Sequence, residues 1–296
     1  MRRLRNFSIL LFIVSVALFL AFQLRARSHK DSSGLDIFMG SGTIEASVTD
    51  GEDVLLADVT ARDSRDGDVT DSLVVEKIST FLRPSTRIIT YAAFDKENHV
   101  TRAERELVYT DYEAPKFTIT EPLIFSAGTT EILANVSVAD CLDGDLTDSV
   151  KILSNERLMV DVPGNYEIKL QAANSAGDVE TLPVTVKILE EGPGELQIFL
   201  SDYVVYVPAG GEFDPLSLVK EVKIGGTKYP VVPGAGSYEN GVNNPAEVTV
   251  GTNYIHVDDT VDRSTPGDYR VTYSMTIEKG NGTEISGETT LYVVVR

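Results

Sequence analysis

Residues 59–72 read VTARDSRDGDVTDS, and residues 136–149 read VSVADCLDGDLTDS. The two stretches lie 77 residues apart and are identical at eight positions, which include an Asp-Gly-Asp turn and a closing Asp-Ser. Asp-Gly between strand-forming residues is a strong hairpin signal, because glycine tolerates the left-handed backbone that tight turns need. The repeat therefore predicts the same acidic β-turn at two places in the chain.

The repetition continues beyond this turn. Residues 84–100 align with residues 163–179, and PGNYEIKL at 163–170 is similar to PGDYRVTY at 266–273. In both of the latter stretches a Pro-Gly turn leads into alternating apolar and polar residues, which is typical of a strand with one buried face. No long stretch after residue 30 has the 3.6-residue apolar period of a helix. The sequence therefore predicts an all-β fold of sandwich domains.

These motifs also carry a family resemblance. The phrase D-x-x-D-G-D-[VL]-T-D-S, followed by P-G-x-Y-x-[IV]-x-[LY], resembles the bacterial surface Ig-like domain family, in particular the pesticidal crystal protein-type Ig-like modules of unknown function. Residues 195–296 share the second motif but lack D-G-D, and residues 84–86 read PST in place of P-G-x. The resemblance implies Ig-like sandwiches on an exported protein. It implies little about activity, because one sandwich fold hosts many functions.

The N-terminus predicts a membrane anchor. Residues 7–24 read FSILLFIVSVALFLAFQL, which as a helix would span about 27 Å and cross the core of a bilayer. Arg2, Arg3 and Arg5 precede the span, so residues 1–6 are expected to be a cytoplasmic basic tail and the remainder to be extracellular. A cleaved signal peptide is the alternative, but the end of the span lacks the small-residue pattern of a cleavage site.

We therefore expect three tandem Ig-like β-sandwich domains after a single N-terminal transmembrane helix. The predicted domains are residues 32–112, residues 113–190 and residues 195–296, the last with a long loop at 225–245. Each is expected to have its own small hydrophobic core. Cys141 is the only cysteine, so the chain cannot form an intramolecular disulfide, which favours a bacterial surface protein over a disulfide-stapled eukaryotic one.

The charge distribution limits the partners. The net charge is −19, and the first 30 residues hold six basic residues and no acidic one, so the rest of the chain carries −25. A body of this charge would be repelled by nucleic acid and by anionic lipid headgroups. We expect no nucleic-acid partner, and the bilayer as a partner only through the N-terminal helix.

The acidic turns are candidate calcium sites, because calcium prefers clustered carboxylate oxygens. The junction TDYEAPKF at 110–117 adds two more carboxylates, those of Asp111 and Glu113, just before the second predicted domain. The candidate metal ligands are Asp63, Asp66, Asp68, Asp111, Asp140, Asp143 and Asp145. The alternative is that these side chains only cap backbone groups in the turns.

No catalytic residue or organic cofactor is predicted. The three histidines, His29, His99 and His256, accompany no nucleophile in a familiar motif, and no glycine-rich phosphate loop is present. The function expected from the sequence is a non-enzymatic, membrane-anchored extracellular protein that acts in adhesion, in protein interaction or as a spacer. The alternative is a carbohydrate- or cell-wall-polymer-binding accessory protein of envelope polysaccharide systems. For this alternative, Tyr203, Tyr206, Tyr229, Tyr238 and Tyr254 are candidates for a sugar-binding platform.

Overall fold

The computed structural model describes residues 34–153, 158–191, 194–238, 248–279 and 282–296. The predicted tail 1–6 and transmembrane segment 7–24 lie outside the described residues. Within the described ranges, no helix combines the length and the apolar character needed to cross a membrane. The chain divides into two compact units, which we call unit 1 (residues 1–112) and unit 2 (residues 113–296).

Unit 1 consists of two sheets and a short helix, α2 (Glu52–Leu56). One sheet has the order β1-β3-β4, with β1 at Leu35–Met39, β3 at Val59–Asp63 and β4 at Gly67–Asp68. The other has the order β2-β7-β6-β5, with β2 at Thr43–Ala46, β7 at Val100–Tyr109, β6 at Thr86–Phe94 and β5 at Val74–Ile78. Alternate residues are buried in the second half of β7, whereas β6 buries three residues in succession from Tyr91 to Ala93. Ile89, Tyr91 and Leu107 are fully buried.

Unit 2 begins with a pair of sheets that we call module 2 (residues 113–190). One sheet has the order β11-β10-β8, with β11 at Gly144–Asp145, β10 at Val136–Asp140 and β8 at Lys116–Ile119. The other has the order β12-β13-β14-β9, with β12 at Lys151–Leu153, β13 at Gly164–Ala173, β14 at Val179–Leu189 and β9 at Ile124–Ser126.

A second pair of sheets, module 3 (residues 195–296), completes unit 2. One sheet has the order β15-β17-β18-β19, with β15 at Leu196–Leu200, β17 at Val219–Ile224, β18 at Thr227–Val232 and β19 at Val250–Gly251. The other has the order β16-β22-β21-β20, with β16 at Val204–Val207, β22 at Glu284–Val295, β21 at Gly267–Glu278 and β20 at His256–Asp259.

The same strand plan recurs in all three pairs of sheets. A long antiparallel hairpin, β6–β7, β13–β14 or β21–β22, forms the centre of one sheet. An early short strand, β2, β9 or β16, then pairs in parallel with the second strand of that hairpin. The predicted all-β sandwich fold is therefore confirmed. The chain has three pairs of sheets but divides into only two compact units, so the presence of three independent domains stays a prediction.

The acidic turns form as the sequence predicts. Gly67 has φ +78° and Gly144 has φ +74°, a backbone conformation that favours glycine at both positions. Each turn joins a buried strand to a two-residue strand, β3 to β4 and β10 to β11. The repeat in the sequence is thus a repeat in backbone conformation.

One part of the sequence prediction is wrong. The long loop expected at 225–245 begins instead with a hairpin, in which β17 and β18 pair across Gly225 and Gly226. Both glycines have positive φ, +55° and +92°, which matches the backbone of a two-residue hairpin turn. The remainder of the predicted loop includes residues 239–247, which lie outside the described residues.

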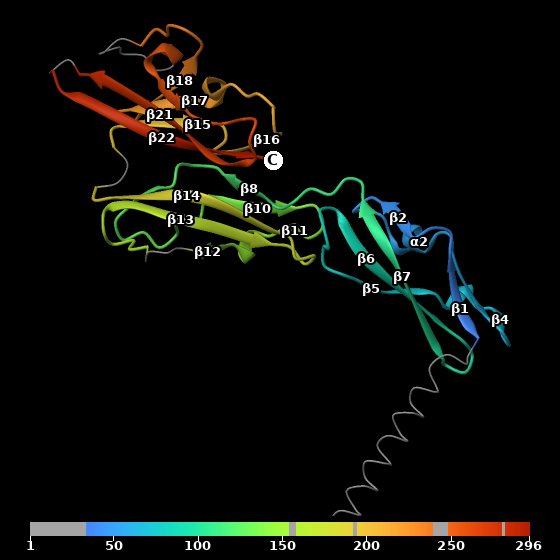
Figure 1. The fold of residues 1–296 in the computed structure, drawn as a ribbon. Coiled ribbons are helices and arrows are strands. Elements are labelled where there is room, and N and C mark those ends of the chain that lie inside the picture. Colours follow the sequence, from blue (N-terminus) through green and yellow to red (C-terminus); the bar gives the residue numbers. More distant parts are fainter. Residues whose placement is uncertain (1–33, 154–157, 192–193, 239–247, 280–281) are drawn as a thin grey trace, which may run out of the picture. The chain divides into compact units, whose positions relative to one another are not determined.

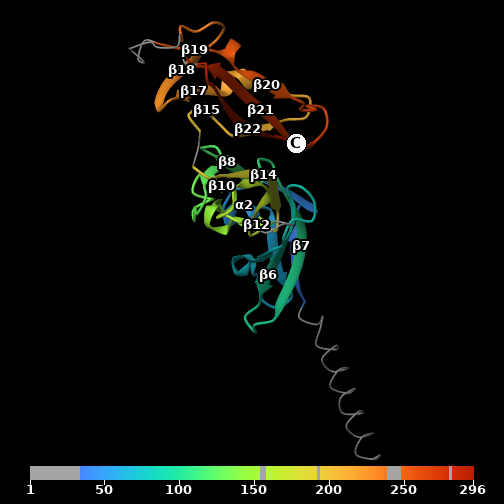
Figure 2. The ribbon, with the colours of Figure 1, turned by 90° about the vertical axis from the view of Figure 1, so that its left-hand side faces the viewer.

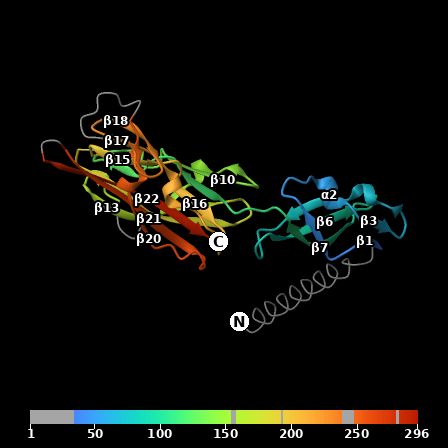
Figure 3. The same ribbon diagram turned by 90° about the horizontal axis from the view of Figure 1, so that it is seen from above.

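The two modules of unit 2 share one hydrophobic core. Buried side chains from Phe117 in β8 to Val295 in β22 form a continuous cluster. In β22, Leu291 to Val295 are all buried, so this strand is covered on both faces. Figures 1 to 3 show modules 2 and 3 next to each other. The separate cores expected for residues 113–190 and 195–296 are therefore not observed. The sheet that contains β22 is buried on both faces, so the core of module 2 and the core of module 3 are continuous.

Candidate functional site

The first aspartate of each acidic turn closes its own loop. Asp63 Oδ1 accepts hydrogen bonds from the backbone N–H groups of Arg65 at 2.7 Å and Asp66 at 2.8 Å. Asp140 Oδ1 accepts the equivalent two bonds, both at 2.9 Å. These side chains thus hold the backbone of the turn in both repeats.

The last aspartate of each turn caps the short 3₁₀ segment that follows. Asp68 Oδ1 accepts from the N–H of Thr70 at 3.0 Å, and Asp145 Oδ1 accepts from the N–H of Thr147 at 2.9 Å. Hydrogen bonds from the hydroxyl and the backbone of these threonines lower the pKa of both aspartates. Both carboxylates are therefore ionised near neutral pH and engaged with their own loops.

The middle aspartates and Asp111 join separate loops. Asp66 Oδ2 accepts from the N–H of Lys96 at 2.9 Å, and Asp143 Oδ1 accepts from the hydroxyl of Ser175 at 2.7 Å. Asp111 accepts from the Ser47 hydroxyl at 2.6 Å and from the N–H of residue 48 at 2.8 Å. The Ser47 hydroxyl is the main reason that the pKa of Asp111 is lowered.

In these contacts the aspartate side chains cap backbone N–H groups of the turns. Within the described residues, the three carboxylates of either turn are not brought together as a group of converging ligand atoms, although another group is. A calcium ion at these turns would have to compete with the backbone N–H groups for the same oxygens. Calcium binding by the seven predicted aspartates stays a prediction.

The converging group consists of Asp95, Glu97 and His99, in the turn between β6 and β7. One ligand atom from each of these residues lies within 4.8 Å of the others. His99 Nδ1 is 2.6 Å from Asp95 Oδ2 and 3.9 Å from Glu97 Oε2. The hydrogen bond with Asp95 raises the pKa of His99. The sequence analysis missed this group, although the D-x-E-x-H spacing in a tight turn was a readable signal.

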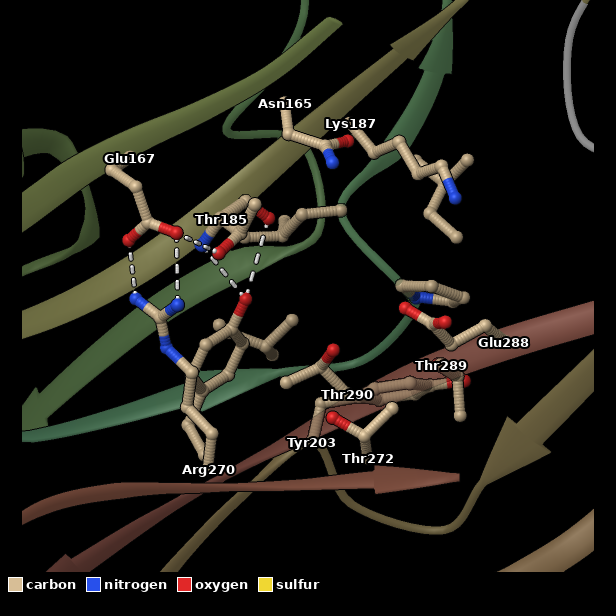
Figure 4. A pocket seen from close by; sticks show the side chains of 15 residues that line it. Asn165, Glu167, Thr185, Lys187, Tyr203, Arg270, Thr272, Glu288, Thr289 and Thr290 are labelled. Carbon is tan, nitrogen blue, oxygen red and sulfur yellow. Dashed lines mark hydrogen bonds and ion pairs between the residues drawn. The ribbon is translucent and has the colours of Figure 1, made fainter. Parts of the chain in front are cut away.

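A polar pocket lies between modules 2 and 3. It has a volume of about 260 Å³, and Figure 4 shows charged, amide and hydroxyl side chains along its walls. Asn165, Glu167, Thr185 and Lys187 come from the hairpin of module 2, and Arg270 comes from the hairpin of module 3. The pocket is thus a product of the packing of the two modules.

Two contacts beside this pocket join the modules. Arg270 forms two hydrogen bonds to Glu167, at 2.9 and 2.5 Å, which Figure 4 shows as a pair of parallel contacts. Tyr292, which is 4% exposed, accepts a hydrogen bond from the Thr185 N–H at 2.9 Å and donates to the Thr185 carbonyl at 3.3 Å. Burial raises the pKa of Tyr292. The neutral phenol therefore serves as both donor and acceptor in the interface.

Acidification is expected to lower the stability of unit 2 by protonating Glu167. The hydrogen bonds from Arg270 hold the pKa of Glu167 below its ordinary value of 4.5. The carboxyl of the unfolded chain therefore takes up a proton first, so the stabilisation is complete above about pH 4.5 and is lost as the pH falls through the folded-state pKa. Because both side chains are partly exposed, we expect a loss of only about 0.5 kcal/mol.

Calorimetric melting of the full chain in detergent micelles, as a function of pH, tests this expectation. Glu167→Gln should flatten the acidic part of the profile for unit 2. Glu191→Gln, which removes the same charge from an exposed position outside the pocket, should leave the profile unchanged. A profile that is unaffected by Glu167→Gln would contradict the assignment.

The tyrosines proposed as a sugar platform do not share one surface. Tyr203 is buried, and Tyr206 accepts a hydrogen bond from the Phe117 N–H at 2.8 Å inside the module interface. Tyr229 and Tyr238 form an edge-to-face pair 5.3 Å apart, partly buried against the core. Tyr254 is 43% exposed. Most of these rings therefore have a packing role.

The single cysteine and the two remaining histidines do not form a reactive site among the described residues. Cys141 Sγ contacts the backbone of Glu113, and burial is the main reason that the pKa of its thiol is raised, so it is a poor nucleophile at neutral pH. His256 lies at the exposed start of β20, and His29 lies outside the described residues.

Comparisons with known proteins identify no family. No family model matches the chain, and no curated protein matches it. A solved structure of the CBM51-2 and INT domains of Clostridium perfringens ZmpB in complex with GlcNAc is 17% identical, with a TM-score of 0.22 over 52% of this chain and 26% of that chain. Drosophila N-cadherin EC1-4 is 14% identical, with a TM-score of 0.23 over 86% and 74% of the two chains. The chain thus spans about a quarter of the first of these chains, and likeness at this level has no bearing on function.

Proposed function

We propose that this chain is a non-enzymatic, single-pass membrane protein whose β-sandwich modules act outside the cell in adhesion or as a spacer. Residues 7–24 would anchor it in the cell membrane. The acidic modules would project outward, and their net charge of −25 would keep them off the anionic headgroups.

The observation that carries the proposal is the continuous core of unit 2. Covalently linked domains with small polar interfaces move relative to one another, whereas a large hydrophobic interface prevents this motion. In unit 2 the interface contains buried Tyr292 and Val294 and is bordered by the Arg270–Glu167 pair. Two modules fused in this way hold their ends at a fixed separation, which is what a spacer or the arm of an adhesin needs.

Protease treatment of intact cells that express the full chain tests the location. We expect protease to remove the modules from the cell surface, so that an antibody against the C-terminus no longer detects the chain in intact treated cells. A cytoplasmic protein in the same cells serves as the control for lysis. Protection of the C-terminus in intact cells, with digestion only after lysis, would contradict an extracellular location.

The pocket between modules 2 and 3 favours a second candidate function, the binding of a carbohydrate or wall polymer. Its walls supply hydroxyl, amide and charged groups, which are suited to hydrogen bonding with sugar hydroxyls. Glycan-array binding of the full chain should then be lost in Asn165→Ala and Lys187→Ala. Lys169→Ala, on the same strand as Asn165 but outside the pocket, should bind normally. An array on which the unmodified chain binds no glycan would exclude this function.

A further inference from the structure

One buried carboxylate oxygen in unit 1 lacks a partner. Asp63 is 4% exposed, and its Oδ2 atom has no hydrogen-bond partner among the residues that the structure describes. Its Oδ1 atom, in contrast, accepts two backbone hydrogen bonds. A buried polar atom without a partner costs about 1–3 kcal/mol, and more when it is charged. This oxygen therefore needs a donor or a cation.

Module 2 shows how the same position is satisfied by a donor. Asp140 is the counterpart of Asp63, and its Oδ2 accepts a hydrogen bond from Asn174 Nδ2 at 3.1 Å. Asn174 begins the turn after β13, as Asp95 begins the turn after β6. The Oδ1 atoms of both residues accept backbone N–H groups of the turn, from Asp178 and His99 respectively. The equivalence of the two turns puts Asp95 Oδ2 where Asn174 has its amide nitrogen.

Unit 1 therefore has two carboxylates where module 2 has a carboxylate and an amide. The Oδ1 atoms of Asp63 and Asp95 are both engaged by backbone N–H groups. A carboxylate has acceptor oxygens only, so neither side chain can donate to the other as the amide of Asn174 does, and the two like charges repel each other.

The local basic side chains do not give Asp63 Oδ2 a partner. His99 pairs with the other carboxylate, 2.6 Å from Asp95 Oδ2, and makes no hydrogen bond to Asp63 Oδ2. Arg65 Nη1 pairs with Glu97 at 3.1 Å, and Lys96 Nζ lies 3.5 Å from Asp66 Oδ1. Both basic groups are more than 70% exposed, and neither reaches the buried Oδ2 atom of Asp63. A compact cation between the two carboxylates would satisfy that oxygen and remove the repulsion.

We propose that this end of unit 1 binds a divalent metal ion through four side chains: Asp63, Asp95, Glu97 and His99. Three carboxylates and one imidazole form a mixed oxygen and nitrogen set, which suits zinc or manganese better than calcium or magnesium. The ion would tie the end of β3 to the β6–β7 turn, and so would join the two sheets of the sandwich. The corresponding turn of module 2 lacks this set, because its amide already satisfies the aspartate.

Titration calorimetry of the chelator-treated full chain in detergent micelles with ZnCl₂, MnCl₂ and CaCl₂ tests the site. We expect zinc or manganese to bind. In a separate hydrogen-exchange measurement, the bound ion should increase the protection of peptides that cover residues 59–68 and 91–101. Asp95→Asn should weaken binding by more than about tenfold, since even residues outside the ligand set can cost that much. His99→Gln should also weaken the binding of zinc or manganese.

A control variant and a measurement without metal distinguish binding at this site from a general effect of charge. Asp36→Asn removes an exposed carboxylate from the same unit and should leave metal binding unchanged. In chelator, Asp95→Asn should raise the melting temperature of unit 1, because the new amide can donate to Asp63 as Asn174 does to Asp140. The proposal would be overturned if no ion binds, if Asp95→Asn binds as well as the unmodified chain, or if calcium alone binds.

Discussion

Tyr292→Ala should destabilise unit 2 by about 3–5 kcal/mol, the cost of truncating a fully buried aromatic side chain. Tyr292 is 4% exposed, and its ring packs in the interface between modules 2 and 3. The change also leaves the backbone N–H of Thr185 without its acceptor, which adds to the loss from the cavity. The melting temperature of unit 2 should fall by on the order of 10 °C, because a unit of this size loses a few degrees for each kcal/mol.

Scanning calorimetry of the full chain in detergent micelles measures this effect, with the transition of unit 1 as an internal reference. Tyr292→Phe keeps the ring and removes only the hydroxyl, so it should cost about 1–2 kcal/mol. Tyr254→Ala removes a tyrosine that is 43% exposed and should change the stability by less than about 0.5 kcal/mol. If Tyr292→Ala changed the stability of unit 2 no more than Tyr254→Ala does, the assignment of Tyr292 to a buried interface between the modules would be wrong.

The strands of the sandwiches were predictable because their signals are local. The alternation that follows Pro163 and Pro266 lies within the strands β13 and β21. The Asp-Gly turns at residues 66–67 and 143–144 close the expected loops. In each of these cases, one short stretch of sequence contains both the apolar face and the turn chemistry that specify the structure.

The fusion of modules 2 and 3 was not predictable from the same patterns. The surface of module 2 that receives Tyr292 contains Glu167 and Thr185, which in a strand pattern look like solvent-facing positions. Their partners lie more than a hundred residues away in sequence. The available signal was the run Leu291 to Val295, because five consecutive apolar residues indicate a strand buried on both faces.

The acidic residues show a different limit. A sequence rich in aspartate near a glycine is equally consistent with a metal loop and with capped turns, and the structure uses the oxygens of Asp68 and Asp145 as caps. What separates Asp63 from Asp140 is a single substitution in a distant turn, Asp95 against Asn174. The alignment of the repeats contains this difference, but its meaning depends on a contact that only the fold reveals.

That difference leads to the second large effect. Asn174→Asp should copy the paired carboxylates of unit 1 into module 2, where Asn174 is 5% exposed and Asp140 is 7% exposed. The change replaces a hydrogen bond of 3.1 Å by the repulsion of two buried charges. We expect a loss of about 4 kcal/mol, in the range found when a buried charge is left uncompensated.

Chemical denaturation of the full chain in chelator measures this loss, and Asn174→Ala separates its two causes. The alanine variant removes the donor but adds no charge, so it should cost about 2 kcal/mol. The additional loss in Asn174→Asp should be smaller at about pH 4 than at about pH 8, because a proton held between the two carboxylates relieves their repulsion. If the aspartate and alanine variants lost the same stability at both pH values, the two side chains would not face each other in module 2. The equivalence from which the position of Asp95 in unit 1 is inferred would then fail as well.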